Sequence, residues 1–441
     1  MNLSIRFNDN LMIKISYSKL MRTSALFLGL IISASAIYGQ NAPQKYSDLI
    51  RRADSLYGAK DFNNSAKAFS DAFKADGNRA TVNEHYNAAC SWSLAGNCDS
   101  AFSHLYFIAT MMDYNRYGHI KSDPDLTSLH SNSRWEPLLE AIKANKQKAY
   151  PFLEFLNVNG FRVEAITFGL ANNQPDKPVV VFENGMASTW DVWKTVIDEV
   201  SKSNAVFAYN RPRIGDSDDD SLPPTPKHIV DNLRTMLLEK GFKPPYMLVS
   251  HSFGGAYIRS FASYYPDEVA GLVFVDPIDF TKIKDYGNLP YLEIGLSQPQ
   301  IDSLFGQKYN DYLEKLYSEM PRFYVEEVKM SVQLSASDFE ECNRNPLPDV
   351  PVHFLMAGGY PTAPDDRGET IFDKKKLFRI DNTIKMKRWI ELINPLKYGK
   401  FIYCSNSGHY MQKDDPDVVI ASIKLALQDY DRIHNEKTTG Q

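Results

Sequence analysis

The feature that most constrains the fold is a regular alternation that begins after Tyr150. Short runs of apolar and β-branched residues are separated by longer segments with helical spacing. Several of the runs are apolar throughout, as is typical of parallel strands that are covered on both faces. Alternating strands and helices predict an α/β domain with a mostly parallel sheet over residues 149–432, followed by a polar tail at 433–441. The predicted strands span 161–168, 179–182, 206–209, 246–249, 272–275, 352–356 and 401–404.

A long interruption separates two of these predicted strands. Residues 279–348 have a helical pattern and are rich in tyrosine. An insertion of this size predicts a helical cap over the carboxyl edge of the sheet, where the loops that follow parallel strands gather. Its aromatic residues either line an apolar pocket or pack the cap against the core. They are Tyr286, Tyr291, Phe305, Tyr309, Tyr312, Tyr317, Phe323 and Tyr324.

Residues 40–148 differ from the rest, because they are rich in alanine and have helical spacing throughout. The Ser-Ala pairs at 65–66 and 100–101 recur about 35 residues apart, close to the 34-residue period of tetratricopeptide repeats. The region therefore resembles about two degenerate repeats of that kind. Two repeats seldom stand alone, so we expect them to dock on the following domain or to be capped by the helix at 135–145. Such a region either binds a peptide or protein partner or is a structural appendage.

Residues 1–39 have the layout of a secretory signal peptide. An apolar run at 25–32 follows a basic residue and precedes small residues. The run is far shorter than the roughly 20 apolar residues needed to span a bilayer. We therefore expect cleavage near Gly39 and export to the periplasm or the extracellular space, with no membrane span. Translation starts at either Met1 or Met21.

Charge and cysteine content argue against several other classes of protein. The chain has 49 Lys and Arg against 54 Asp and Glu, a formal net charge of −5, so it lacks the basic surplus that nucleic-acid binding requires. Its four cysteines are too few for a disulfide framework in 441 residues. Cys90 and Cys98 either pair or remain free thiols. No metal-binding or dinucleotide motif occurs, so no metal or cofactor is implied.

Residues 246–262 carry the most specific motif. An apolar strand leads directly into the turn at 250–255, Ser-His-Ser-Phe-Gly-Gly, and then into a helix. Small residues allow a sharp turn whose apex residue is conformationally strained. The segment resembles the nucleophile elbow of the α/β-hydrolase family, with Ser252 at the apex and Ser250 in place of the first glycine of Gly-x-Ser-x-Gly.

Two further segments occur in the order that this family shows. Residues 179–186 resemble the strand and turn that precede the oxyanion loop. The segment at 205–217 resembles the family's Asp-Arg-x-Gly-x-Gly-x-Ser loop, with Asn210 in the Asp position. The resemblance covers most of the chain after the helical region. It implies an oxyanion hole formed by the backbone amides of Met186 and Phe253.

A serine nucleophile needs a base and a group that orients the base. His409 is the candidate base among nine histidines, because the others lie in the helical region, in the tail, at a helix start, inside a strand or beside the nucleophile. The last of these, His251, is expected to point away from the serine. The family's usual acid follows the second-last strand, where no carboxylate occurs before Asp365 and Asp366. In some relatives the acid follows the preceding strand, which makes Asp276 the preferred acid.

The resemblance implies a serine hydrolase that cleaves a small-molecule acyl ester through a Ser-His-Asp acyl-enzyme mechanism, and the signal-peptide layout adds export. Aminopeptidase activity and carbon–carbon bond hydrolysis are alternative serine reactions that the sequence leaves open for this protein. A serine at the apex argues against dehalogenase and epoxide hydrolase chemistry. The alternative from another class is a binding or adaptor protein whose hydrolase fold no longer turns over. We further expect the cap to affect the substrate range more than the reactivity of the serine.

Overall fold

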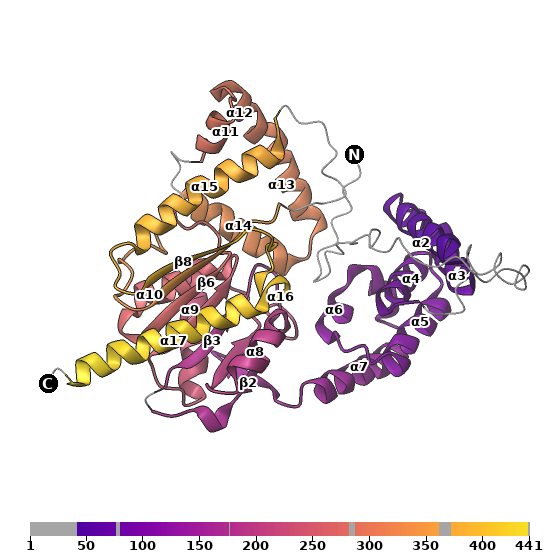
Figure 1. Cartoon of the computed structure of the whole chain (residues 1–441). Coiled ribbons are helices and arrows are strands. Elements are labelled where there is room, and N and C mark those ends of the chain that lie inside the picture. Colours follow the sequence, from indigo (N-terminus) through magenta and orange to yellow (C-terminus); the bar gives the residue numbers. More distant parts are fainter. Residues whose placement is uncertain (1–41, 76–79, 176, 282–286, 361–371, 440–441) are drawn as a thin grey trace, which may run out of the picture. The chain divides into compact units, whose positions relative to one another are not determined.

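The computed structural model (Figure 1) describes residues 42–439 apart from 76–79, 176, 282–286 and 361–371. The chain divides into two compact units at the bond between Pro151 and Phe152, and each unit is described by itself. The predicted signal peptide, Tyr286 and the alternative acids Asp365 and Asp366 lie outside the described residues. Within the described ranges, no helix is long and apolar enough to cross a membrane.

The first unit consists of helices, as the sequence predicts. α2 packs against α3, α3 against α4 and α4 against α5, so these helices form successive hairpins (Figure 1). α7, the helix expected to cap them, packs against α5. The likeness to tetratricopeptide repeats stays a prediction. The helices are α2 (Ala42–Gly58), α3 (Phe62–Ala75), α4 (Val82–Leu94), α5 (Cys98–Met111), α6 (Tyr117–Ser122), the 3₁₀ helix η1 (Pro124–Leu129) and α7 (Trp135–Ala149).

Small residues and aromatic rings form the core of this unit. Ala66 is fully buried, which lets neighbouring helices approach closely, and Phe69 and Phe102 fill the space between helices. The cysteines of the chain are free thiols, Cys90 and Cys98 included, so the structure contains no disulfide between these two residues.

The second unit is built on one eight-stranded sheet with the order β1-β2-β4-β3-β5-β6-β7-β8. β2 pairs antiparallel with β1 and β4, and the other neighbouring pairs are parallel. The predicted mostly parallel sheet is therefore confirmed. The strands are β1 (Leu153–Val158), β2 (Phe161–Phe168), β3 (Val179–Glu183), β4 (Val206–Tyr209), β5 (Tyr246–His251), β6 (Val269–Val275), β7 (Val352–Ala357) and β8 (Gly399–Cys404).

β1 was not predicted from the sequence. This edge strand is largely unburied apart from Val158, so it lacks the continuous apolar run of the buried strands. The turn that joins it to β2 has positive φ angles at Asn159 (51°) and Gly160 (95°). Asn-Gly between two strands is a strong hairpin signal. That dipeptide is the feature of the sequence that points to β1.

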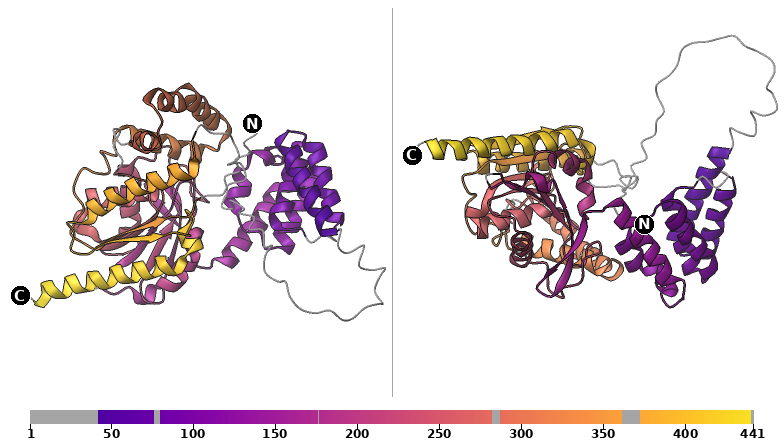
Figure 2. Two further views of the ribbon diagram at one scale, coloured as in Figure 1. Left: turned by 45° about the horizontal axis from the view of Figure 1, so that its top comes forward. Right: turned by 90° about the horizontal axis from the view of Figure 1, so that it is seen from below.

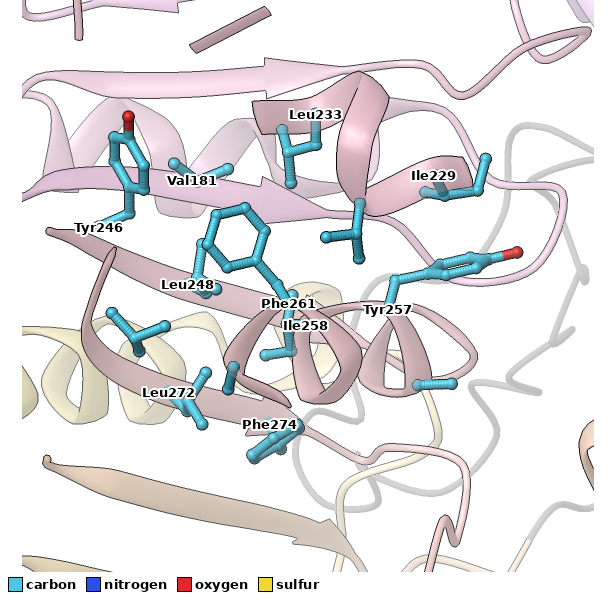
Figure 3. Packing of buried hydrophobic residues seen from close by; sticks show 14 of the residues in the cluster. Val181, Ile229, Leu233, Tyr246, Leu248, Tyr257, Ile258, Phe261, Leu272 and Phe274 are labelled. Carbon is cyan, nitrogen blue, oxygen red and sulfur yellow. The ribbon is translucent and has the colours of Figure 1, made fainter. Parts of the chain in front are cut away.

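Helices cover both faces of the sheet, because alternate side chains of each strand point to opposite faces. Val181, Leu248 and Leu272 of neighbouring strands pack in one buried cluster with Ile258 and Phe261 of α10 (Figure 3). α9 packs beside α10 on this face, and α8 and α17 pack together on the other (Figure 2). The helices outside the insertion are η2 (Leu170–Asn172), η3 (Trp190–Trp193), α8 (Lys194–Val200), α9 (Pro226–Glu239), α10 (Gly254–Tyr264), η4 (Pro266–Glu268), α15 (Lys374–Ile393), α16 (Met411–Asp414) and α17 (Pro416–Thr439).

The insertion predicted at 279–348 is helical and joins β6 to β7. Its last helix packs on the core cluster through Met330 and Leu334. Two of its tyrosines, Tyr309 and Tyr312, are 39% and 43% exposed, so they neither fill the core nor line a closed pocket. The insertion contains α11 (Leu289–Glu293), α12 (Gln298–Phe305), α13 (Gln307–Glu319) and α14 (Arg322–Ala336).

Most of the predicted polar tail is helical. α17 continues as a helix to Thr439, so most of residues 433–441 belong to it. Lys397 forms an ion pair with Glu436 at 2.6 Å, which adds a tertiary contact in this last part of the helix.

Candidate active site

The turn between β5 and α10 has the strained geometry that the sequence predicts. Ser252, between the two elements, has a φ angle of 52°. A residue with a side chain rarely adopts this left-handed conformation, which costs about 1–2 kcal/mol. Backbone hydrogen bonds hold it in place: the Ser252 amide donates to Val275, and its carbonyl accepts from Gly255 and Ile278. The turn therefore projects the Ser252 side chain away from both flanking elements.

Close approach of neighbouring chains explains the glycines of this turn. A Cβ at Gly254 would lie 2.5 Å from the carbonyl oxygen of Asn184, and a Cβ at Gly255 would lie 2.7 Å from the Pro277 ring. Neither distance is compatible with a side chain. Ser250, in place of the family's first glycine, is fully buried, and its Oγ has no hydrogen-bond partner among the described residues. The site therefore tolerates a serine here at the cost of one unpaired hydroxyl.

The structure brings Ser252 and His409 together from positions far apart in the sequence. His409 lies in the loop between β8 and α16, and its Nε2 is 2.9 Å from Ser252 Oγ. The other ring nitrogen, Nδ1, is 2.6 Å from Asp276 Oδ2. The His409 side chain is half exposed, whereas that of Asp276 is 14% exposed. The three side chains thus form a hydrogen-bonded chain that runs from a largely buried carboxylate to a partly exposed hydroxyl.

Asp276 is held at its place by the neighbouring strand. It follows β6, its amide donates to the Leu355 carbonyl, and its Oδ1 accepts from the Ala357 amide at 3.0 Å. Its φ angle of 40° turns the side chain out of the strand direction. A carboxylate from the end of β6 therefore reaches the end of β7, next to the site where the family's usual acid is expected.

His251 contacts the candidate base, His409, in a way that the sequence does not predict. Its Nε2 donates a hydrogen bond to the backbone carbonyl of His409 at 2.8 Å, and the two rings are 4.6 Å apart. Burial, with His409 as a weaker contribution, lowers the pKa of His251 well below its usual value. The ring is consequently neutral with its proton on Nε2. Adjacency to Ser252 is the signal in the sequence, but that signal does not indicate which residue His251 supports.

The turn after β3 passes directly against the candidate nucleophile. A Cβ at Gly185 would lie 2.7 Å from His251 Nδ1 and 3.4 Å from Ser252 Cβ, so only glycine fits. In the described part of the chain, neither the Met186 nor the Phe253 amide has a recorded hydrogen-bond acceptor. Two unpaired amides beside a nucleophile are the arrangement that an oxyanion hole requires.

Asn210 serves the structure around this turn. The side-chain Oδ1 accepts a hydrogen bond from the Trp190 backbone amide at 2.8 Å, and the Asn210 backbone amide donates to the Glu164 carbonyl at 2.8 Å. The next residue, Arg211, forms a buried ion network with Glu183 and with a residue of α14. Sequence reasoning assigned this arginine no role, and the local pattern contains no signal for its distant partner.

One group of potential metal ligands occurs in the first unit. Ligand atoms of Cys90, Asp123 and Asp125 lie within 4.8 Å of one another. Both carboxylates already accept hydrogen bonds from tyrosines, Asp123 from Tyr86 and Asp125 from Tyr57. The group is therefore accounted for as a polar network that joins α2, α4 and η1.

The profile of the Alpha/beta hydrolase family matches residues 180–422, which is more than half of the chain. The order and direction of the strands agree with that match. The chain belongs to the alpha/beta hydrolase family, and its hydrolase fold is preceded by a helical unit.

Individual relatives are distant or cover only part of the chain. The AB hydrolase superfamily protein of Gibberella zeae is 20% identical over 330 residues, 66% of this chain and 95% of the relative. The uncharacterized protein YqjL of Bacillus subtilis is 31% identical over 98 residues, 22% of this chain. The chain spans 39% of that relative and 32% of an uncharacterized Schizosaccharomyces pombe protein.

The similar solved structures are also distant in sequence. The epoxide hydrolase VrEH1 of Vigna radiata matches 63% of this chain and 97% of its own, with 14% identity and a TM-score of 0.41. A likeness of this degree carries no conclusion about the reaction. The reaction of this chain must therefore be argued from its own site.

Proposed function

We propose that this protein is an exported serine hydrolase that cleaves small-molecule acyl esters through an acyl-enzyme. The supporting observation is the chain of two hydrogen bonds from Ser252 Oγ through the His409 ring to Asp276, at 2.9 and 2.6 Å. A strained apex serine, a base within hydrogen-bond reach and a carboxylate behind the base are the parts that nucleophilic acyl transfer requires.

In the proposed first half-reaction, Ser252 Oγ attacks the acyl carbonyl while His409 Nε2 takes the serine proton. Asp276 keeps a proton on Nδ1, so that the Nε2 lone pair faces the serine, and it stabilises the imidazolium that forms. The amides of Met186 and Phe253 hold the oxyanion of the tetrahedral intermediate. The bond from carbon to the leaving oxygen then breaks, and the alcohol departs with the proton from His409.

In the second half-reaction, water takes the place of the alcohol. His409 removes a proton from the water as it attacks the acyl carbon, and the tetrahedral intermediate collapses to a carboxylic acid. The proton returns to Ser252 Oγ, which restores the site. An ester is the proposed substrate class because an alkoxide is a better leaving group than an amide nitrogen, and it departs with the proton that His409 carries.

The geometry also bears on the alternative of an inactive binding protein. That alternative rested on the lack of a carboxylate directly after the strand at 352–356. Asp276 accepts a hydrogen bond from the Ala357 amide at the end of this strand. Asp276 therefore supplies a carboxylate beside the end of this strand, and this supports turnover over a purely binding role.

Labelling with a fluorophosphonate probe tests the proposal. The probe is expected to label the wild type at one site, and Ser252→Ala and His409→Ala are expected to abolish labelling. His228→Ala is the matched control, because His228 also pairs with a carboxylate, Asp220, at 2.5 Å but lies outside the site. A wild type that neither labels nor hydrolyses p-nitrophenyl acetate would refute the proposal.

Export is a separate part of the proposal. Its support is the apolar run at 25–32 and the small residues after it. Expression of the full chain followed by N-terminal sequencing of the mature protein is expected to show a start near residue 40. A mature protein that retains residues 1–39 and stays in the cytosol would contradict export. A peptide or protein partner for the helical unit is likewise proposed from the repeat-like pattern alone.

A further inference from the structure

A buried ion network contacts the turn that contains Met186. Arg211 follows β4 and is 1% exposed. Its Nη1 donates to Glu183 Oε1 at 2.5 Å, and its Nε donates to Glu327 Oε1 at 2.6 Å. Glu183 ends β3, whereas Glu327 lies on α14, 116 residues away from Arg211 in the sequence. The network therefore joins the sheet to the helical insertion.

The same two groups also hold the backbone of the turn. Arg211 donates from Nη1 to the Asn184 carbonyl and from Nη2 to the Gly185 carbonyl, each at 2.7 Å. Glu327 Oε2 accepts from the Ala187 amide, also at 2.7 Å. Residues on both sides of Met186 are thus fixed by one guanidinium and one carboxylate. The Met186 amide is left without an acceptor among the described residues.

The turn needs such support because its backbone is strained. Ala187 has a φ angle of 53°, in the left-handed region. A residue with a side chain keeps this conformation only where its surroundings hold it, because the strain costs about 1–3 kcal/mol. The Ala187 amide donates its hydrogen bond to Glu327. Without it, the amide would be unpaired and the turn would be free to relax.

The composition of the network argues that it does more than stabilise the fold. One guanidinium and two carboxylates are buried together, and Glu327 is 3% exposed. Removing ions from water is costly, and apolar residues of similar size often stabilise a fold as well or better. Charged groups retained at such a place, next to a strained turn and a candidate nucleophile, are better explained by the geometry that they impose.

We infer that Glu327 is a positioning residue, through which helix α14 of the insertion holds the oxyanion turn so that the Met186 amide faces the reacting carbonyl. This inference rests on the proposed function. It predicts that the insertion also affects reactivity, whereas the sequence led us to expect an effect mainly on the substrate range. The insertion supplies a buried support for the oxyanion hole, although Glu327 itself touches neither substrate nor nucleophile.

Glu327→Gln tests the inference with the smallest change in shape. The amide oxygen of glutamine replaces one acceptor, but its NH₂ group faces either Arg211 or the Ala187 amide, both of which are donors. Glu326→Gln is the matched control, since it is the neighbouring residue of the same helix with the same chemical change. Loss of one oxyanion donor typically costs about 10²- to 10³-fold in kcat. We expect Glu327→Gln to lower kcat on p-nitrophenyl acetate at least tenfold and up to this range.

A positioning role predicts a particular pattern of kinetics. The KM is expected to change less than threefold, and fluorophosphonate is expected to label all Ser252 at a slower rate. The pH dependence of kcat/KM is expected to keep its apparent pKa, because the hydrogen bonds of His409 are unchanged. Arg211→Lys keeps the charge but loses the fork that binds both carbonyls, so it is expected to show the same pattern.

Each other outcome overturns the inference in a distinguishable way. If the wild type does not label, the proposed function fails and the inference fails with it. If the wild type labels and Glu327→Gln matches Glu326→Gln within twofold, the inference fails while the proposed function stands. A lower labelled fraction with an unchanged rate per labelled site means that Glu327 only stabilises the fold. If neither Glu327→Gln nor Arg211→Lys folds, the positioning role is rejected in favour of a structural one.

Discussion

Replacing Asp276 with asparagine reverses the direction of the hydrogen bonds around His409. Asp276 Oδ1 accepts from the Ala357 amide, and Oδ2 lies 2.6 Å from His409 Nδ1. In Asp276→Asn the amide oxygen must face the Ala357 N–H, since a backbone amide can only donate. The NH₂ group then faces His409 Nδ1 and donates to it. The imidazole consequently carries its proton on Nε2, where it points at Ser252 and cannot accept the serine proton.

The magnitude follows from this change of tautomer. The replacement changes neither the size of the side chain nor the number of its hydrogen bonds, so the fold should be retained. A triad with the wrong tautomer typically loses about 10⁴-fold in kcat, which corresponds to about 5 kcal/mol of transition-state stabilisation. We expect Asp276→Asn to lower kcat on p-nitrophenyl acetate by about 10³- to 10⁴-fold.

The assay compares three variants at equal concentration of folded protein. Asp365→Asn and Asp366→Asn are the controls, because these residues were the alternative acids, and both are expected to stay within twofold of the wild type. Circular dichroism and thermal melting verify that Asp276→Asn is folded. Activity of Asp276→Asn within tenfold of the wild type, or an equally deep loss in either control, would refute the argument from the tautomer.

Three further predictions concern stability and packing. Burial, together with the positive charge of Lys400, lowers the pKa of His353 from 6.5 to about 4. As the pH falls, the His353 imidazole therefore becomes protonated in the unfolded chain before it does so in the folded protein. About 3 kcal/mol of stability should be lost between pH 6.5 and pH 4. Urea titrations of the wild type and of His353→Gln check this, since the variant should lose less over that interval. Gly254→Ala should lower the free energy of unfolding by about 1–3 kcal/mol and slow fluorophosphonate labelling, because the alanine Cβ would lie 2.5 Å from the Asn184 carbonyl oxygen. An unchanged labelling rate and melting temperature would contradict the close approach. Phe102→Ala should cost about 3–5 kcal/mol, because Phe102 is 1% exposed in the helical unit, and thermal melting should show it while labelling of Ser252 stays unchanged.

The order and type of the core elements could be predicted from the sequence, because they depend on local patterns. Runs such as 246–249 are apolar on both faces, and a strand covered by two layers of helices requires this. The turn at 250–255 was recognisable because its small residues answer a local steric demand, seen in the φ angle of Ser252 and in the close contacts of Gly254. The edge strand β1 was not predicted, because a half-exposed strand has a weaker pattern of apolar residues.

The contact between Asp276 and His409 and the contact between Glu327 and the turn after β3 depend on tertiary structure. Asp276 meets His409 because β6 and β7 pair in a register that places Asp276 beside Leu355 and Ala357. The Arg211–Glu327 contact depends on how helix α14 returns to the core. Local sequence determines the conformational preferences of a segment, but hydrogen bonds between distant segments depend on which ends of the folded elements meet. The sequence of this protein therefore determined most of its strands and helices and its strained serine turn. Only the folded chain brought Asp276 to the His409 ring and Glu327 to the turn at Met186.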